Sequence, residues 1–284
     1  MMLITRLVRR HPLPSFFSLA CVLTWALLPA ARTSIPISLL ALFGPAVAAL
    51  GVATVTGPTE IRAVWQRLTT WRVSLAWYTV ACALPLAISA LSCALSYLSG
   101  ARGPIRLQPI TPLSLIVFVM VLGEEVGWRG YALPHLVHRF GPWKSSALSG
   151  LLWAFWHLPL FFIDGMPQYG TPWIPYVFYT IGLSLLLTFL ALRTGSSIVI
   201  ATVFHGAVNT FLFVNDAASA TMRGWSNAAG YVLAGVVIAI VAWGRPPTAR
   251  TSRRVSDRIR IRPRRRSTET GAPLGGPHEC RATP

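Results

Sequence analysis

Two adjacent acidic residues, Glu124 and Glu125, follow the apolar run Leu115–Leu122 and precede Arg129. A charged residue at the centre of a membrane helix costs about 2.5–3.5 kcal/mol on insertion scales, so such residues usually face a protein interior and carry function. In a helix, Glu125 and Arg129 stack on one face, whereas Glu124 points about 100° away. We expect Glu125 and Arg129 to form a structural ion pair, and Glu124 to be a carboxylate without a local cation that acts as general base.

Two further apolar stretches carry polar residues with helical spacing. Trp153 and His157 are four residues apart, and so are His205 and Asn209, so each pair shares one face of its helix. A single histidine in a membrane helix is more often an interhelical hydrogen-bonding group than a catalytic one. Two histidines, an asparagine and the acidic residues in the middle of three helices instead favour a common site.

These residue types allow two kinds of chemistry. In the first, Glu124 and His157 hold and deprotonate a water molecule, while His205 and Asn209 donate hydrogen bonds to an oxyanion. In the second, His157, His205 and a carboxylate bind zinc and leave one position open for water. The sequence contains no Gly-x-Ser-x-Gly motif and no cysteine near either histidine. Both alternatives therefore predict hydrolysis by water.

The composition predicts helices in a lipid bilayer that position these residues. The chain has 284 residues, of which 54% are hydrophobic and 12% charged, against about 25% charged in a soluble domain. We expect an all-α polytopic membrane protein with about eight transmembrane helices, each near the ~20 residues that a bilayer requires. The predicted spans are Ser15–Ala31, Ile35–Val55, Val73–Leu98, Leu113–Val137, Trp143–Ile163, Trp173–Leu192, Ser196–Val214 and Ala228–Trp243.

Three connecting segments are predicted to be loops. Residues 56–72 are basic, residues 99–112 contain glycine and proline, and residues 164–172 are polar. The small residues Pro29-Ala30-Ala31 also allow the first span to be a cleaved signal peptide, but an uncleaved first helix agrees better with the spans that follow.

Basic residues indicate the orientation of the chain. The formal net charge is +17, from 25 basic and 8 acidic residues. Arginines concentrate on the side that holds the N-terminus, which predicts cytoplasmic N- and C-termini in the cell membrane. We therefore expect a transmembrane domain at residues 1–244 and a disordered, arginine-rich cytoplasmic tail at 245–284, attracted to anionic lipid. The tail lacks interleaved aromatic residues, so nucleic acid is not an expected partner.

The three motifs together resemble one known family. Glu124-Glu125-x-x-x-Arg129, an aromatic residue four positions before His157, and His205-x-x-x-Asn209 are similar to the CAAX prenyl endopeptidases and bacteriocin-processing enzymes of the CPBP family. The resemblance covers about residues 113–215. It implies a helical intramembrane protease, with Glu124 and His157 as water activators, His205 and Asn209 as oxyanion donors, and Glu125 and Arg129 as structural partners. Trp153 departs from the phenylalanine that is usual in the family.

The resemblance implies a peptide or protein substrate but leaves the metal open. Glu124, His157 and His205 are the candidate zinc ligands. Asparagine is a poor zinc ligand and a good hydrogen-bond donor, so Asn209 favours the mechanism without a tightly bound metal. Two other functions stay open: a non-catalytic, bacteriocin-immunity-type membrane scaffold, and an ion-coupled transporter, since intramembrane Glu and His residues also suit a proton relay.

Overall fold

The computed structural model describes residues 2–31 and 34–244, and in these residues the fold is helical apart from two short strands. The predicted all-α membrane fold is thus confirmed. Four helical stretches are long and apolar enough to cross a bilayer, namely Pro12–Ala30, Leu75–Leu98, Trp173–Arg193 and Ala220–Trp243. The presence of eight spans and the cytoplasmic location of both termini stay predictions. The predicted tail at 245–284 lies outside the described residues.

The elements follow one another along the chain in this order: α1 (Met2–Arg10), α2 (Pro12–Trp25), α3 (Leu28–Ala31), α4 (Ile35–Leu42), α5 (Gly44–Thr56), α6 (Pro58–Leu68), α7 (Leu75–Leu98), β1 (Ile105–Leu107), α8 (Pro112–Glu125), the π-helix η1 (Val126–Ala132), α9 (Leu133–His157), the 3-10 helix η2 (Leu158–Phe161), α10 (Trp173–Arg193), α11 (Ile198–Thr210), β2 (Phe213–Asn215) and α12 (Ala220–Trp243).

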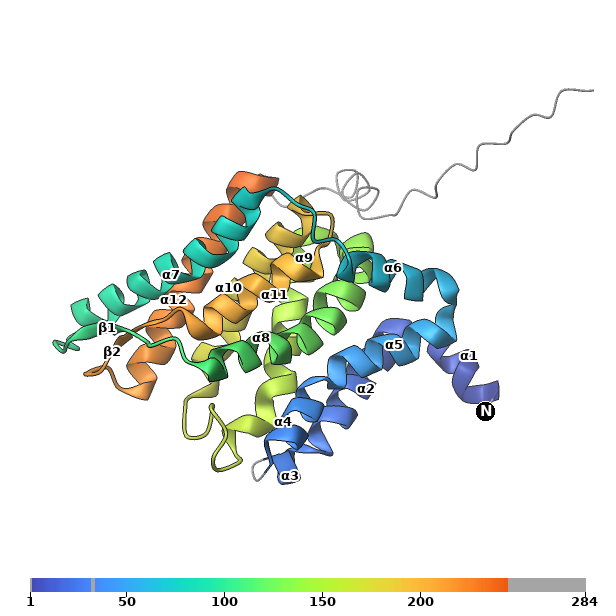
Figure 1. The fold of residues 1–284 in the computed structure, drawn as a ribbon, viewed down its shortest axis with the longest axis horizontal. Coiled ribbons are helices and arrows are strands. Elements are labelled where there is room, and N and C mark those ends of the chain that lie inside the picture. Colours follow the sequence, from blue (N-terminus) through green and yellow to red (C-terminus); the bar gives the residue numbers. More distant parts are fainter. Residues whose placement is uncertain (1, 32–33, 245–284) are drawn as a thin grey trace, which may run out of the picture.

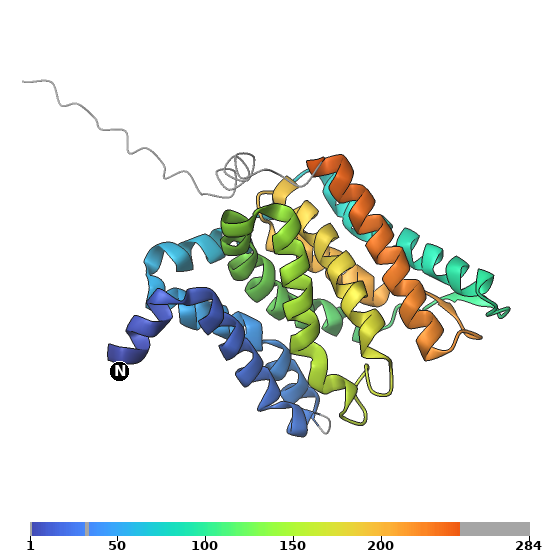
Figure 2. The same cartoon turned by 180° about the vertical axis from the view of Figure 1, so that it is seen from behind.

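The helices form two layers that lie one behind the other in Figure 1, with α7, α11, α8 and α5 in one layer and α12, α10, α9 and α2 in the other. At one end, α12 packs on α7 and α10, and α7 also contacts α11. At the other end, α2 packs on α5, and α9 lies between these N-terminal helices and α10 (Figure 2). Helices α8 and α11 contact each other in the middle of the first layer. The three helices that carry the predicted site residues, α8, α9 and α11, therefore lie in the centre of the molecule.

The second predicted span, Ile35–Val55, is broken into α4 and α5 at Phe43. Pro45 has no backbone N–H, so it cannot donate to the carbonyl of Ala41 one turn earlier. The hydroxyl of Thr24 on α2 donates to this carbonyl instead, at 2.8 Å. A neighbouring helix thus satisfies the hydrogen bond that the proline removes, and this stabilises the break.

The predicted loop at 56–72 is wrong, because most of it forms the amphipathic helix α6. Pro58 occupies the first helical position, where the missing N–H costs nothing. Ile61, Val64 and Leu68 follow helical spacing and pack against the main core. The basic residues of this segment had favoured a loop, but Arg62 lies on the exposed side of the helix and Arg67 is buried.

The predicted element Leu113–Val137 is helical throughout but changes type in the middle. It begins as α8, passes through η1 and continues into α9. The helix kinks at Gly141, whose φ of 74° lies in the left-handed region that glycine tolerates. The span predicted from Trp143 then runs to His157 and ends in η2. Short π-helices occur frequently at functional sites, and η1 directly follows the two acidic residues.

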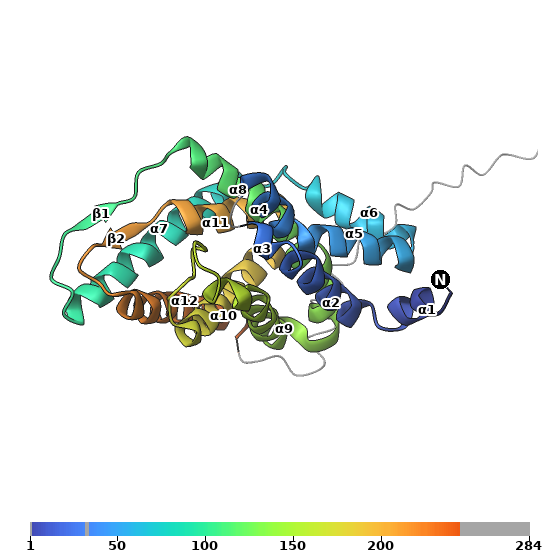
Figure 3. The same ribbon diagram turned by 90° about the horizontal axis from the view of Figure 1, so that it is seen from below.

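Two predictions near the C-terminal end of the fold need correction. The helix expected at Ser196–Val214 is the shorter α11, because Phe213–Asn215 is a strand that pairs antiparallel with β1 inside the predicted loop at 99–112. The helix expected at Ala228–Trp243 begins earlier, at Ala220, where Ser219 accepts a hydrogen bond from the Met222 N–H. Both strands lie at the end of the molecule away from α1 (Figure 3).

Candidate active site

A buried ion pair connects the end of α8 with η1. Arg129 Nη1 donates to Glu125 Oε1 at 3.0 Å, and the two side chains are 2% and 0% exposed. This is the pair that the four-residue spacing predicts. The same Glu125 oxygen lies 2.9 Å from Nδ1 of His205 on α11. Glu125 therefore connects three helical segments rather than only stabilising its own helix.

Glu124 has a neutral hydrogen-bond partner. The indole N–H of Trp153 on α9 donates to Glu124 Oε2 at 2.8 Å, and both side chains are buried. No cation forms a hydrogen bond or ion pair with Glu124 among the described residues. The indole N–H fixes one carboxylate oxygen and leaves the other, Oε1, for a further partner.

The ring of Trp153 lies at the centre of the charged groups. The guanidinium carbon of Arg129 is 4.5 Å from the ring centroid, a cation–π distance. The His205 ring meets the same indole edge to face, with centroids 4.9 Å apart. One side chain thus contacts an acid, an arginine and a histidine, which restricts the position of all three.

His157 is oriented by its own helix. Its Nδ1 lies 2.9 Å from the carbonyl oxygen of Trp153, one turn earlier. Because a carbonyl only accepts, Nδ1 carries the proton, and Nε2 of the neutral ring carries the lone pair. His157 is therefore prepared to accept a hydrogen bond from water.

A close approach of two helices brings His205 to this place. A Cβ on Gly206 of α11 would lie 2.4 Å from the ring of Phe118 on α8, so a larger residue would separate these helices. Glycine at this position allows α11 to lie directly against α8. Gly206, which directly follows His205, thus sets the distance between the histidine and the two acidic residues.

One cavity of about 660 Å³ joins all four predicted catalytic residues. It is lined by Glu124, His157, His205 and Asn209, together with Trp153 and apolar side chains. Glu124, His157 and His205 are buried, whereas Asn209 is exposed at the end of α11. Glu125 and Arg129 do not line the cavity and lie behind it. The arrangement combines a carboxylate, two imidazoles and an amide around a space large enough for a peptide segment.

Helix α6 packs against η1 and does not line the cavity. Arg67 is almost fully buried, and its Nη1 donates to the carbonyl of Gly130 at 2.6 Å. Glu60, at the other end of α6, lies 3.4 Å from Nε2 of His135 at the start of α9. This hydrogen bond with His135 lowers the pKa of the Glu60 carboxyl. None of these contacts was predicted from the sequence, because residues 56–72 were expected to form a loop.

The candidate zinc ligands do not form a metal-binding group. Within residues 2–31 and 34–244, no three His, Cys, Asp or Glu side chains come together in such a group. Nδ1 of His157 is used by a carbonyl and Nδ1 of His205 by Glu125, although both leave Nε2 available. Because no such group is found among the described residues, we derive the chemistry from the chain's own residues.

Several cavity residues were not predicted from the sequence, among them Tyr176 and Gln168. Tyr176 on α10 packs its ring edge to face on His157, with centroids 5.4 Å apart, and Gln168 lines the cavity from the preceding loop. A tyrosine in an apolar helix and a glutamine in a polar loop have no distinctive spacing. Trp153 was recognised as aromatic, but the direction of its N–H depends on packing and could not be read from the sequence.

Fold and cavity together define a multi-pass helical membrane protein whose central cavity gathers carboxylate, imidazole and amide groups. Residues 106–211 match the family model described as type II CAAX prenyl endopeptidase Rce1-like. A stretch of 104 residues is 32% identical to CAAX prenyl protease 2 of Methanococcus maripaludis, covering 34% of this chain and 38% of that protein. The resemblance drawn from the three motifs is thus confirmed for the region that runs from β1 to α11.

Proposed function

We propose that this protein is an intramembrane endopeptidase that hydrolyses a peptide bond with water activated by Glu124 and His157. The observation that carries the proposal is the orientation of Glu124. One carboxylate oxygen is fixed by the Trp153 N–H at 2.8 Å, in a cavity that two histidines and an asparagine also line. The similarity to a family of prenyl endopeptidases supports the reaction class.

Glu124 is suited to act as the general base. With Oε2 held by Trp153, Oε1 is the oxygen that accepts a proton from water. His157 accepts the second hydrogen bond of the same water through Nε2, because its Nδ1 donates to the Trp153 carbonyl. Two acceptors of this kind orient the water lone pair towards a carbonyl carbon.

His205 and Asn209 are suited to stabilise the oxyanion. Glu125 accepts the Nδ1–H of His205, so only the imidazolium form also has an N–H at Nε2 to donate to an oxyanion. Glu125 is then the counter-ion of both His205 and Arg129. With Glu124 ionised, two negative and two positive groups balance in this buried region, which limits the cost of the charges.

The reaction balances with these groups alone. The water oxygen attacks the peptide carbonyl carbon, and Glu124 takes the water proton. The carbonyl oxygen becomes the oxyanion, which His205 and Asn209 stabilise; removal of one such donor typically costs about 10²–10³ in rate. The C–N bond then breaks, and the proton on Glu124 passes to the leaving nitrogen. The products are a carboxylic acid and an amine.

The substrate class we propose is a peptide or membrane-anchored protein that reaches the cavity from the lipid. The apolar cavity walls suit a hydrophobic segment. The relative is named CAAX prenyl protease 2, but the match covers only 38% of its length. We therefore extend to this chain only the hydrolysis of a peptide bond. Surrounding lipid is the other partner.

Comparative proteomics of membrane fractions tests the proposal. Cells producing the wild-type protein or the Glu124→Gln variant are compared by labelling of new peptide termini. Glutamine keeps the size and the acceptor for Trp153, so equal amounts of both proteins are expected in the membrane. We expect one or more new termini only with the wild type, and accumulation of the uncleaved precursors with the variant.

Two results would contradict the proposed function. If Glu124→Gln yields the same termini and the same cellular phenotype as wild type, the polar cluster has a structural role, as in a membrane scaffold. If no new peptide terminus depends on Glu124, but ion flux into liposomes depends on it, the polar residues of the cavity serve transport.

A further inference from the structure

A second pocket, of about 490 Å³, adjoins the central cavity. Val117 and Asn209 line both spaces, so the two are contiguous at the wall that contains Asn209. We call this second pocket the annex. Its polar lining residues are Arg106, Gln108, Thr111, Ser114, Asn209 and Thr210. The annex is thus more polar than the cavity it extends.

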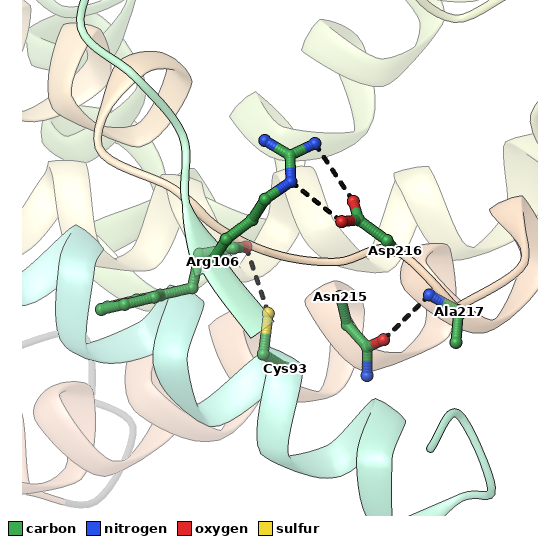
Figure 4. Close-up of polar contacts among 6 residues, drawn as sticks. Cys93, Arg106, Asn215, Asp216 and Ala217 are labelled. Carbon is green, nitrogen blue, oxygen red and sulfur yellow. Dashed lines mark hydrogen bonds and ion pairs between the residues drawn. The ribbon is translucent and has the colours of Figure 1, made fainter. Parts of the chain in front are cut away.

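The edge of the annex that carries Arg106 is firmly anchored. Arg106 on β1 pairs with Val214 on β2. Beside this pair, Cys93 of α7 donates to the carbonyl of Phe213 at 3.1 Å. The Asn215 side chain donates to the Ala101 carbonyl at 2.8 Å. It also accepts from the Ala217 N–H at 3.1 Å (Figure 4). A pocket wall whose strand β2 is held by side-chain bonds, and whose strand β1 pairs with it, is preorganised for a ligand.

Arg106 uses only two of its three guanidinium nitrogens in hydrogen bonds. Its Nε and Nη2 donate to the two oxygens of Asp216, at 2.9 and 3.1 Å. The remaining nitrogen, Nη1, points away from Asp216 (Figure 4) and has no hydrogen-bond partner in the described part of the chain. Asp216 is also attracted by Arg223. Asp216 thus interacts with two cations, of which Arg106 lines the annex, and no acidic side chain lines the annex.

Two further features of the annex favour an anion. Thr111 precedes the first residue of α8 and Ser114 lies in its first turn, so the positive end of the helix dipole faces this pocket. Thr210 is 3% exposed, and its hydroxyl has no hydrogen-bond partner among the described residues. A buried hydroxyl without a partner is costly, and Thr210 lines the annex, so a rotation of its side chain would turn the hydroxyl to a ligand there and offset that cost.

We propose that the annex binds a carboxylate of the substrate peptide, held by Nη1 of Arg106 and the hydroxyl of Thr210. The proposal rests on the proposed function, because it places one end of a peptide whose scissile bond lies at Glu124. It adds a specificity site to the cavity that the function already uses. The carboxylate is either the end of the peptide chain or an acidic side chain within it.

The distance along α8 sets the position of the carboxylate in the substrate. Val117 and Thr111 precede Glu124 by 7 and 13 residues. At 1.5 Å per helical residue these spacings correspond to about 10–20 Å. An extended peptide covers about 3.3 Å per residue, so the carboxylate is expected about three to six residues from the cleaved bond.

The test uses binding, so that it does not depend on turnover. The Glu124→Gln protein in nanodiscs is exposed to pools of random decapeptides with a central benzophenone for photo-crosslinking. One pool ends in a carboxylate, one in a carboxamide, and one in a carboxamide with a glutamate four residues after the benzophenone. We expect the carboxylate forms to crosslink about tenfold more than the neutral pool, as for a charge-assisted hydrogen bond. The preferred pool identifies the source of the carboxylate.

Two matched variants separate carboxylate binding from a structural ion pair. Arg106→Gln and Asp216→Asn both remove the bond between β1 and the residue after β2, but only the first removes the cation. We expect Arg106→Gln to lower crosslinking of the carboxylate pools to the neutral level, and Asp216→Asn to retain or increase it. If Arg106→Gln fails to fold, the charge swap Arg106→Asp with Asp216→Arg keeps an ion pair and is expected to lose the preference.

Equal crosslinking of all three pools to the Glu124→Gln protein would overturn the proposed subsite, and so would an equal loss in both single variants. These results leave the proposed function intact if wild-type protein still produces new termini that depend on Glu124. Conversely, a carboxylate preference without any Glu124-dependent cleavage supports the subsite and contradicts the hydrolysis.

Discussion

Two arginine–carboxylate pairs of almost equal length lie in opposite surroundings. Glu125 and Arg129 are 3.0 Å apart and 0% and 2% exposed. Arg106 and Asp216 are 2.9 Å apart and 56% and 43% exposed. The first pair has no access to water, so each charge depends on the other, whereas water can replace either partner in the second. Distance alone therefore does not tell what an ion pair contributes.

A third pair lies between these extremes. Glu60 and His135 are 3.4 Å apart, with side chains 33% and 26% exposed, and they connect α6 to the start of α9. The three pairs form a series from the interior to the surface. We expect the buried pair to contribute most to folding, whereas the exposed pair contains the arginine that we propose to bind a carboxylate. Removal of one acid at a time tests this order.

The largest effect is expected at the buried pair. Glu125→Ala leaves Arg129 without its partner and also removes the acceptor of His205. Breaking a buried pair costs about 3–5 kcal/mol, so we expect little folded protein after extraction, measured by detergent-resistant yield and thermal unfolding. The double change Glu125→Gln with Arg129→Met removes both charges and should recover part of the yield. Wild-type yield and activity of Glu125→Ala would show that the pair does not support the fold.

The next effect concerns Glu124, the buried acid with a neutral partner. Trp153→Phe keeps an aromatic ring near Arg129 and His205 but removes the N–H that fixes Glu124. A hydrogen bond to a charged group is worth about 1.5–3 kcal/mol, so we expect kcat to fall by about 10- to 100-fold with KM nearly unchanged.

The control for Trp153→Phe is Trp77→Phe, since the Trp77 ring contacts Phe189 rather than any residue of the cavity. A rise in KM without a fall in kcat would show that Trp153 only shapes the cavity. In wild-type protein, the indole nitrogen resonance of Trp153 should also move on Glu124→Gln substitution, which reports the hydrogen bond directly.

A smaller effect is expected at the intermediate pair. Because the hydrogen bond with His135 lowers the pKa of Glu60, its contribution to stability is present above the ordinary glutamate pKa of about 4.3 and is lost as pH falls through the lowered value. We expect Glu60→Gln to cost about 1 kcal/mol or less at pH 7, measured by the Tm. The Tm difference from wild type should close on acidification. A difference that is constant from pH 7 to pH 3 would show that the charge of Glu60 does not contribute.

No effect is expected from chelation. The two histidines and Glu124 do not form a metal-binding group in the part of the chain that the structure describes. We therefore expect purified protein to keep its activity after treatment with a chelator. Near one equivalent of zinc in active protein, lost with activity on chelation and restored by added zinc, would overturn the metal-free mechanism and change the charge balance of the buried cluster.

The buried site was more predictable from the sequence than its support. Four-residue spacing identifies pairs on one helix, such as Glu125 with Arg129, because helix geometry is local. The contacts of Trp153 with Glu124 and of Arg67 with Gly130 join residues 29 and 63 positions apart. Such contacts depend on how the helices pack against each other, and this packing cannot be predicted from the spacing of residues in one sequence.

The fold shows the same difference between local and distant information. Long apolar helices such as α7 and α10 were predicted within a few residues, since composition alone identifies them. The amphipathic α6 and the strands β1 and β2 were missed, because their stability comes from contacts with other elements. Helix α6 packs on the core, and the strands pair only with each other over a long separation in sequence.

The most direct test of the account is the rate of peptide-bond cleavage by purified wild-type and Glu124→Gln protein in liposomes, with the substrate identified by terminal labelling. Both proteins should unfold at the same Tm, because glutamine still accepts the Trp153 hydrogen bond. We expect the wild type to cleave one bond and to incorporate oxygen from labelled water into the new carboxyl group, and the variant to be at least about 10² slower. Cleavage by a folded Glu124→Gln protein at the wild-type rate would contradict the role of Glu124 as the base.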